Sequence, residues 1–290
     1  MGRVATTVDE QIKLLTDRGL VLDCGEQKAK EHLLDIGYYR LGFYWNPFEI
    51  DNKHSFKKGT NFSTVINLYY LDVDLRYLLM RALNRIEINI RTQIIYQVSN
   101  YYKNSPTWFS DPKVMKTKFI QDFPRFYDYK FIDNNKPIKE HHNKYINDIY
   151  APAWKTLEFL TFGSIYSIFY NLKDDVLKKK IIQYYGIKKV DVFINYFRTI
   201  IFIRNICAHS GLLYDANTPL AVKPTPLIKI NNNNRHSLNT AIQVIIHFLG
   251  KISSNRKGDL EKDIEKLYLQ HKDSQEIKDI IENKIGFNFC

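Results

Sequence analysis

An arginine, an asparagine and a histidine stand close together near the end of a strongly apolar segment, as Arg204, Asn205 and His209. The N–H groups of an arginine hold phosphates and carboxylates, and a histidine accepts and donates protons near neutral pH. These residue types point to chemistry on a phosphate ester, in which the cation binds the charge and the imidazole moves protons.

The apolar segment around these residues predicts a helix. Phe197 and Ile200 recur at helical spacing, and Arg204 follows on the same row. Because an unpaired guanidinium is costly to bury, Arg204 should meet a carboxylate, a phosphate or a solvent-filled cleft. We expect Gly211 to end the helix close to His209.

The spacing of the two ionisable residues leaves two arrangements open. Five residues separate Arg204 from His209, which places their side chains roughly 140° apart on an ideal helix. Either the helix ends near His209 and the side chains converge there, or two copies of the helix meet across a dimer axis and pool both pairs.

The spacing Arg-x4-His has the form of the HEPN ribonuclease motif, and no other histidine in the chain has an arginine at the right distance. The short motif by itself is not specific. In the alternative interpretation, Arg204 is a structural ion-pair residue and His209 caps the helix.

A second, longer helix is predicted from a cap at residues 63–64 to about residue 102. Beside its apolar stripe, Glu87 and Arg91 are one turn apart and can pair with each other. If this stripe packs against the apolar helix, Glu87 becomes a candidate partner for Arg204, with Arg91 in support.

The chain is basic, with 42 Lys and Arg against 31 Asp and Glu, a formal charge of +11 and a pI near 9.3. This excess favours a polyanionic partner, nucleic acid first and an acidic membrane surface second, although lysine runs are often only solvated faces. The aromatic segment 37–48 can stack bases or form part of a core. The candidate RNA-binding residues are Arg40, Lys57, Lys58, Lys178, Lys179, Lys180, Lys188 and Lys189. We expect the last five to flank the candidate site.

Several classes of protein are disfavoured. Cys24, Cys207 and Cys290 form neither a metal-binding pair nor an even disulfide set, and the pair His141-His142 lacks the spacing of a helical metal site. We therefore expect no metal and no cofactor. No signal peptide and no run of about 20 apolar residues is found. The expected location is the cytoplasm, without a membrane contact.

No stretch alternates as a strand does, so the predicted fold class is all-α. We expect a small N-terminal helical module over residues 1–60 and a helical bundle over residues 61–255. The bundle should carry an irregular insertion at about residues 104–151, where prolines are frequent. Residues 256–290 should form a C-terminal helical tail.

Taken together, the motifs resemble the Abi family of bacterial abortive-infection proteins (AbiD/AbiF-like), which belongs to the HEPN superfamily. The matching pieces are Gln11-Ile-Lys-Leu-Leu-x-x-Arg-Gly-Leu20, Ile36-Gly-Tyr-Tyr-Arg-Leu-x-x-Tyr-Trp45, Leu68-Tyr-x-Leu-Asp-x-x-Leu-Arg76, Arg85-Ile-Glu-Ile-x-Ile-Arg91, Pro152-x-Trp154 with Glu158-x4-Gly163, and Arg204-Asn-Ile-Cys-Ala-His209. They cover residues 8 to about 220. The resemblance implies a HEPN-type bundle, a growth-arresting toxin in phage defence and a structured small RNA as antitoxin.

One departure from the family pattern concerns catalysis. Members often carry a second histidine after the motif histidine, and Ser210 stands there in this chain. Because a serine cannot replace that histidine in acid–base chemistry, His209 alone would act within each chain.

The leading hypothesis is a metal-independent endoribonuclease that acts as a homodimer. His209 would move protons, Arg204 would hold the scissile phosphate, and Asn205 would orient His209 or contact the phosphate. Glu87 and Arg91 would brace Arg204. The alternative is a non-catalytic RNA-binding protein that complexes a structured small RNA, and a third possibility is a purely structural dimerisation module.

Overall fold

The computed structural model describes residues 4–230 and 234–289, so Cys290 lies outside the described residues. Helices make up 66% of the structure, and the described residues form no strand, which confirms the all-α fold class. The N-terminal half contains α1 (Val8–Asp17), α2 (Glu26–Ile36), α3 (Tyr38–Trp45), η1 (Asn46–Phe48), α4 (Phe62–Tyr101), η2 (Trp108–Ser110), α5 (Thr117–Asp122), η3 (Phe123–Phe126), α6 (Tyr129–Asn134) and α7 (Lys136–Lys144). The C-terminal half contains α8 (Ala153–Thr156), η4 (Leu157–Phe159), α9 (Phe162–Asn171), α10 (Asp175–Gln183), α11 (Val190–Ala208), α12 (Leu238–Ile252), α13 (Ser254–Leu269), α14 (Gln275–Ile280) and η6 (Ile281–Ile285).

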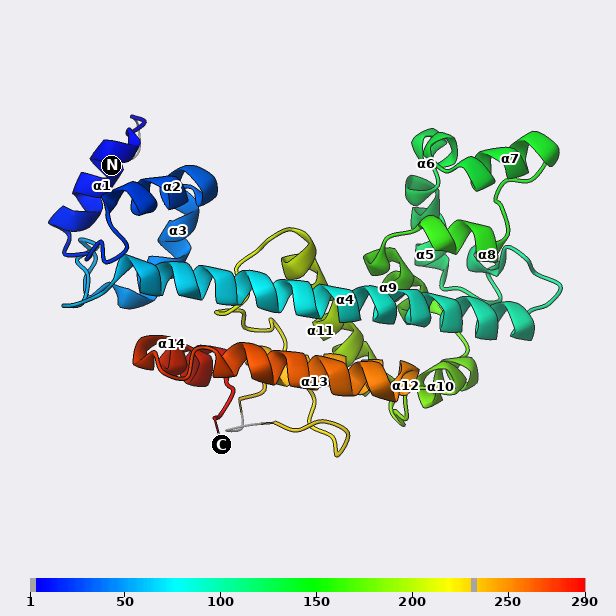
Figure 1. The fold of residues 1–290 in the computed structure, drawn as a ribbon. Helices are drawn as coiled ribbons and strands as arrows, with labels where there is room; N and C mark the ends of the chain where they lie inside the picture. Colours follow the sequence, from blue (N-terminus) through cyan, green and yellow to red (C-terminus); the bar gives the residue numbers. More distant parts are fainter. Residues whose placement is uncertain (1–3, 231–233, 290) are drawn as a thin grey trace.

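Helix α4 is the axis of the molecule (Figure 1). Its 40 residues extend over about 60 Å at the usual helical rise. The long helix was expected, but its predicted cap was wrong: the N-cap is Asn61, and the hydroxyl of Ser63 is hydrogen-bonded to Asp23 instead. From the sequence alone Ser63 is a typical N-cap residue. Its actual partner, Asp23, is 40 positions away and could not be identified from local sequence.

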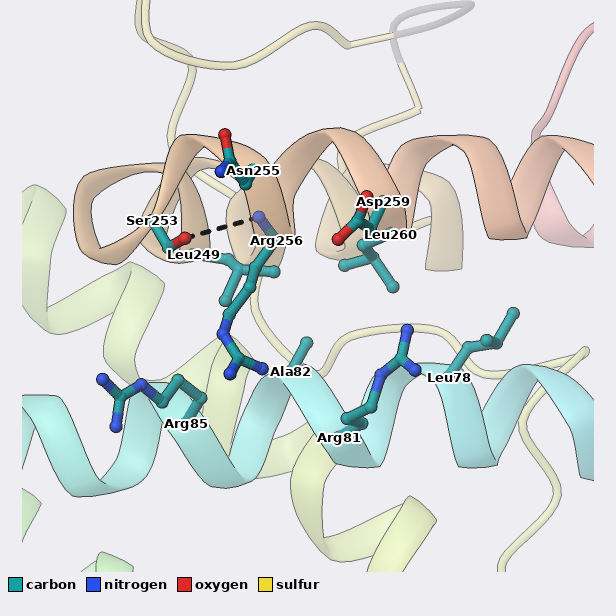
Figure 2. Close-up of a pocket in the computed structure, with 10 residues that line it drawn as sticks. All are labelled: Leu78, Arg81, Ala82, Arg85, Leu249, Ser253, Asn255, Arg256, Asp259 and Leu260. Carbon is teal, nitrogen blue, oxygen red and sulfur yellow. Dashed lines mark hydrogen bonds between the residues drawn. The ribbon is translucent and has the colours of Figure 1, made fainter.

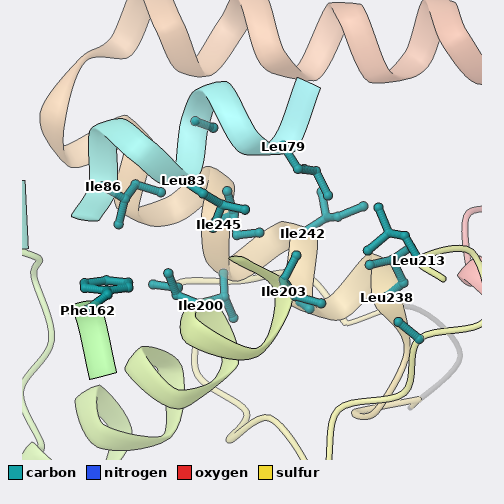
Figure 3. Packing of buried hydrophobic residues seen from close by; sticks show 14 of the residues in the cluster. Leu79, Leu83, Ile86, Phe162, Ile200, Ile203, Leu213, Leu238, Ile242 and Ile245 are labelled. Carbon is teal, nitrogen blue, oxygen red and sulfur yellow. The ribbon is translucent and has the colours of Figure 1, made fainter. Parts of the chain in front are cut away.

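The core forms where α4 meets α11 and α12, and Figure 3 shows their side chains interdigitating. Leu83 and Ile86 of α4 face Ile200 and Ile203 of α11, and all four are fully buried. Each such side chain contributes roughly 1.5–3 kcal/mol through removal of apolar surface from water. This packing fixes the rotation of α11 about its axis and therefore the direction of Arg204.

The N-terminal helices α1, α2 and α3 pack on one another, and α3 packs on the first part of α4. Thr7 and Glu10 form a capping box at the start of α1. In the aromatic segment, Tyr44 and Trp45 are buried, whereas Tyr39 is 82% exposed. The segment therefore belongs mainly to the core, the second of the two alternatives.

The remaining helices lie along α4 on two sides (Figure 1). Helices α5–α7 occupy the stretch in which an irregular insertion was expected, near the C-terminal end of α4, and α8 follows directly after it. Helix α13 runs antiparallel to α4 and packs against both α4 and α12. It buries Leu260 and Ile264, so the beginning of the expected C-terminal tail is part of the core.

Candidate functional site

A chain of charged side chains links α4 to the end of α11. The Nε atom of Arg204 donates to Glu87 Oε2 at 3.1 Å, which is the contact that the sequence suggested. The other carboxylate oxygen, Oε1, accepts from Arg91 Nη2 at 3.1 Å. Glu87 and Arg91 are both buried, so this carboxylate balances two cations away from bulk water.

Arg91 is itself held by further contacts with the segment that precedes α9. Its Nη2 atom also donates to the carbonyl oxygen of Leu160 at 3.1 Å, and its Nη1 atom lies 3.9 Å from Glu158. Because Arg91 cannot turn away, it fixes the carboxylate of Glu87 toward Arg204. The predicted supporting residues are thus brought together around one arginine.

The guanidinium of Arg204 is only partly enclosed, with 27% of the side chain exposed. Its Nη1 atom donates to Asn205 Oδ1 at 3.3 Å, and no described residue forms a hydrogen bond to Nη2. The side chain of Asn205 therefore contacts Arg204, and no hydrogen bond joins it to the ring of His209 among the described residues. One edge of a firmly positioned cation remains available to an anion.

Helix α11 ends at Ala208, and His209 is its C-cap. The residue with left-handed backbone geometry is Ser210, at φ 52°, and not a glycine. The N–H group of Gly211 donates to the carbonyl oxygen of Ile206 at 2.8 Å, as in a Schellman motif. A Cβ atom on Gly211 would lie 3.2 Å from Ile206 Cγ2. The glycine therefore lets the chain pass close to Ile206, while Ser210 takes the left-handed position of the turn.

A buried aspartate that was not among the predicted site residues fixes the loop after the motif. Asp72 of α4 is fully buried and accepts the backbone N–H groups of Leu213 at 3.1 Å and Tyr214 at 2.6 Å. It also accepts the Tyr44 hydroxyl and pairs with Arg76. The signal was present: Asp72 and Arg76 interrupt an apolar helical face one turn apart.

Arg40 is the one candidate RNA-binding residue that the described structure brings to the motif. Its Nη2 atom donates to the carbonyl oxygen of Ser210 at 2.6 Å, which joins the N-terminal helices to the end of α11. A pocket of about 360 Å³ opens at this contact, lined by Arg40, Tyr69, Val73, Arg76, Tyr77, Met80, Cys207 and Ser210. Burial raises the pKa of Cys207 to about 12, so its thiol is not a nucleophile at neutral pH.

His209 is exposed at the end of α11, and no hydrogen bond joins its ring to Arg204 within the described residues. On the same open side of α11, Asn205 borders a pocket of about 350 Å³ together with Phe202 and Arg198. Arg204 is half-buried and His209 is exposed, and the structure shows no hydrogen bond between the two side chains in the described part of the chain.

The expected position of the lysine runs was wrong. Lys188 and Lys189 precede the first turn of α11, whereas the motif lies at its last turn. The 19 residues of α11 place these ends about 27 Å apart. Lys178 is buried, and its ammonium lies 3.6 Å from Asp175, so it is not accessible to a phosphate. Its neighbours Lys179 and Lys180 are exposed.

The remaining candidate groups take ordinary structural contacts. Lys57 donates to the carbonyl oxygen of Pro47 at 2.9 Å, and Lys58 is exposed. His141 is hydrogen-bonded to Asp148, and His142 to Tyr127. Across residues 4–230 and 234–289, no group of three or more His, Cys, Asp or Glu side chains is arranged to hold a metal ion. In the same residues, no helix is long and apolar enough to cross a bilayer.

Comparison with known proteins gives one assignment. No curated protein and no solved structure matches the chain. The profile of the Abi-like protein family matches residues 31–215, which is more than half of the chain and includes α4, the Glu87 network and the motif at the end of α11. This family is associated with abortive infection, a form of phage defence. The chain belongs to the Abi-like protein family.

Proposed function

We propose that this protein is a metal-independent endoribonuclease of abortive infection, with Arg204 and His209 as its catalytic residues. The observation that carries the proposal is the state of Arg204: Glu87 accepts from Nε and Asn205 from Nη1, no described residue bonds Nη2, and the side chain is 27% exposed. A purely structural ion pair does not require an open edge. A cation held in this way is suited to a phosphate, which it can bind without reorganising.

The reaction that fits these groups is transfer of the phosphodiester to the neighbouring hydroxyl of the same ribose. The 2′-oxygen bonds to phosphorus, the bond from phosphorus to the 5′-oxygen breaks, and the products are a 2′,3′-cyclic phosphate and a 5′-hydroxyl. One base must accept the 2′-proton, and one acid must give a proton to the leaving 5′-oxygen. Arg204 would offset the charge that builds on the phosphate oxygens.

A homodimer supplies both proton-transfer groups. Each chain offers one exposed His209, and Ser210 cannot act as a second acid or base. The half-buried Ile201 and Phe202 and the exposed Ala208 leave one side of α11 open to a second copy. In such a dimer one His209 would act as the base and the other as the acid, which is the pooled arrangement that the spacing left open.

The decisive experiment compares wild type with His209→Ala on single-stranded RNA and identifies the product ends. General acid–base catalysis contributes roughly 10²- to 10⁴-fold in rate, so His209→Ala should lose most cleavage. His54→Asn is the matched control, because His54 is an exposed histidine in the loop before α4. If the His209→Ala protein cut RNA at the wild-type rate, the nuclease proposal would be wrong.

A non-catalytic RNA-binding protein that complexes a structured small RNA remains the second candidate. The exposed lysines favour it, because Lys188 and Lys189 lie at the end of α11 that is remote from the motif, and Lys179 and Lys180 lie on the preceding helix α10. Under this proposal, His209→Ala would retain full toxicity in cells. RNA that copurifies with the wild type but not with an Arg204→Ala/His209→Ala variant would instead assign RNA binding to the motif.

A further inference from the structure

A second cationic pocket lies between α4 and α13. It has a volume of about 430 Å³ and is lined by Leu78, Arg81, Ala82, Arg85, Leu249, Ser253, Asn255, Arg256, Asp259 and Leu260. Figure 2 shows Arg256 extending from α13 toward α4, between Arg81 and Arg85. Leu78 and Ala82 of α4 form an apolar floor of the pocket, and Leu260 lines it from α13 on the opposite side.

The three arginines of this pocket are unequally neutralised. Arg81 pairs with Asp263 at 2.9 Å. The side chains of Arg85 and Arg256 form no hydrogen bond or ion pair with any described residue, although Asp259 lines the same pocket. Two guanidinium groups that share a concave surface without a bridging carboxylate repel each other, and an anion placed between them would relieve this repulsion.

The first turn of α13 adds to the positive potential. The hydroxyl of Ser253 caps the helix by accepting the N–H group of Arg256, which leaves the N–H groups of Ser254 and Asn255 without an intrahelical partner. Asn255 lines the pocket. The positive end of a helix and the arginine side chains therefore face the same volume, which favours a multiply charged anion.

We propose that this pocket binds the phosphate groups of a ribonucleotide, with the base or ribose over the apolar floor. Its volume lies in the range of small-ligand sites. The site is separate from the ribonuclease site: Arg85 and Glu87 are two residues apart on α4, about 200° around the helix axis. The proposal does not depend on the proposed ribonuclease function.

Titration calorimetry on the full-length protein tests this site, with ATP, AMP, pyrophosphate and a short 5′-hydroxyl RNA as separate probes. ATP and pyrophosphate should bind more tightly than AMP. Removal of each guanidinium should weaken binding roughly tenfold, so Arg85→Ala/Arg256→Ala should weaken it about a hundredfold. Arg125→Ala is the matched control, because it removes an arginine that is 80% exposed in another part of the molecule. Both target arginines are exposed, so the variants keep the core intact.

The probes separate the possible sources of the phosphate. Binding of ATP that depends on Arg85 and Arg256 assigns the site to a free nucleotide, and the same dependence for the RNA alone assigns it to a strand. The proposal is overturned if no probe binds the wild type, or if the double variant and Arg125→Ala bind equally well. It is also overturned if Arg204→Ala abolishes binding while Arg85→Ala/Arg256→Ala does not.

Discussion

At the scale of single residues, the carboxylate of Glu87 determines whether Arg204 can act. Glu87→Gln keeps the size of the side chain but leaves Arg91 and Arg204 without their shared anion. We expect a decrease of about 2 kcal/mol or more in the free energy of unfolding, because Arg91 is buried and becomes an uncompensated charge. RNA cleavage should fall as well, because Arg204 loses its orientation.

Denaturant unfolding and RNA cleavage assays check this prediction. Glu158→Gln is the control, since the Glu158 carboxylate is more than half exposed and lies 3.9 Å from Arg91. Equal stability of Glu87→Gln and wild type would mean that water or another group neutralises the two arginines.

The sequence was sufficient for some of these residues and not for others. The Glu87–Arg204 contact could be predicted because Arg204 occupies an apolar row, where a charge needs a partner, and Glu87 lies beside the stripe that was expected to pack there. The contact of Arg40 with Ser210 could not, because 170 positions separate the two residues and the donor is an ordinary-looking arginine in an aromatic segment. Asp72 was detectable by the same reasoning as Arg204, since it too is a charge on an apolar row.

At the scale of elements, the end of α11 carries a strained residue. Ser210 adopts a left-handed conformation that costs a residue with a side chain roughly 1 kcal/mol relative to glycine. Ser210→Gly should therefore raise the free energy of unfolding by up to about 1 kcal/mol, measured by chemical denaturation. Ser253→Gly is a useful contrast, since it removes the cap of α13 and should not stabilise.

A destabilised Ser210→Gly variant would show that the Ser210 side chain makes a contact stronger than the backbone strain.

The end of α11 also shows what a sequence can predict about helix ends. The sequence predicted where α11 stops, because an apolar pattern gives way to Gly211, but it assigned the turn to the glycine. Helix extents follow from local periodicity, whereas the residue that takes the left-handed position depends on the close approach of Gly211 to Ile206.

At the scale of the whole molecule, the positive charge is dispersed and does not converge on the motif. Lys188 and Lys189 are exposed at the far end of α11, and Lys179 and Lys180 are exposed on the preceding helix α10. Removing these charges should weaken binding of long RNA and flatten its salt dependence, by about 0.7 in the log–log slope for each phosphate of a single strand that the protein no longer neutralises. Cleavage of an RNA too short to reach this end of α11 should be unchanged.

Filter binding across a salt series and a cleavage assay on a short RNA measure these two effects separately. Lys53→Ala, in the loop before α4, provides an exposed lysine control. A large decrease in short-RNA cleavage would contradict the separation of the lysines from the motif. Net charge alone could not predict this distribution of charge. Lys188 and Lys189 are near Arg204 in sequence, but the length of α11 separates them from it in the fold.

Three histidines make the stability of the whole fold depend on pH. Burial lowers the pKa of His142, His247 and His271 below the usual value. In the unfolded chain these groups bind protons near pH 6.5, whereas in the folded protein they remain neutral to lower pH. The free energy of unfolding should therefore be fully retained above about pH 6.5 and decrease as the pH falls toward the folded pKa values.

The slope of this decrease cannot exceed about 1.4 kcal/mol per pH unit for each histidine, and it is smaller for groups that are partly solvated. Denaturant unfolding at pH 7.5 and pH 5.5 measures it, above the range in which carboxylates titrate. His247→Gln should reduce the difference in the free energy of unfolding between the two pH values, because it removes one of the three partly buried rings. The Nε2 atom of His247 is hydrogen-bonded to the carbonyl oxygen of Tyr185 at 2.8 Å. Equal stability of the wild type at both pH values would show that the three rings can be protonated in the folded protein without cost.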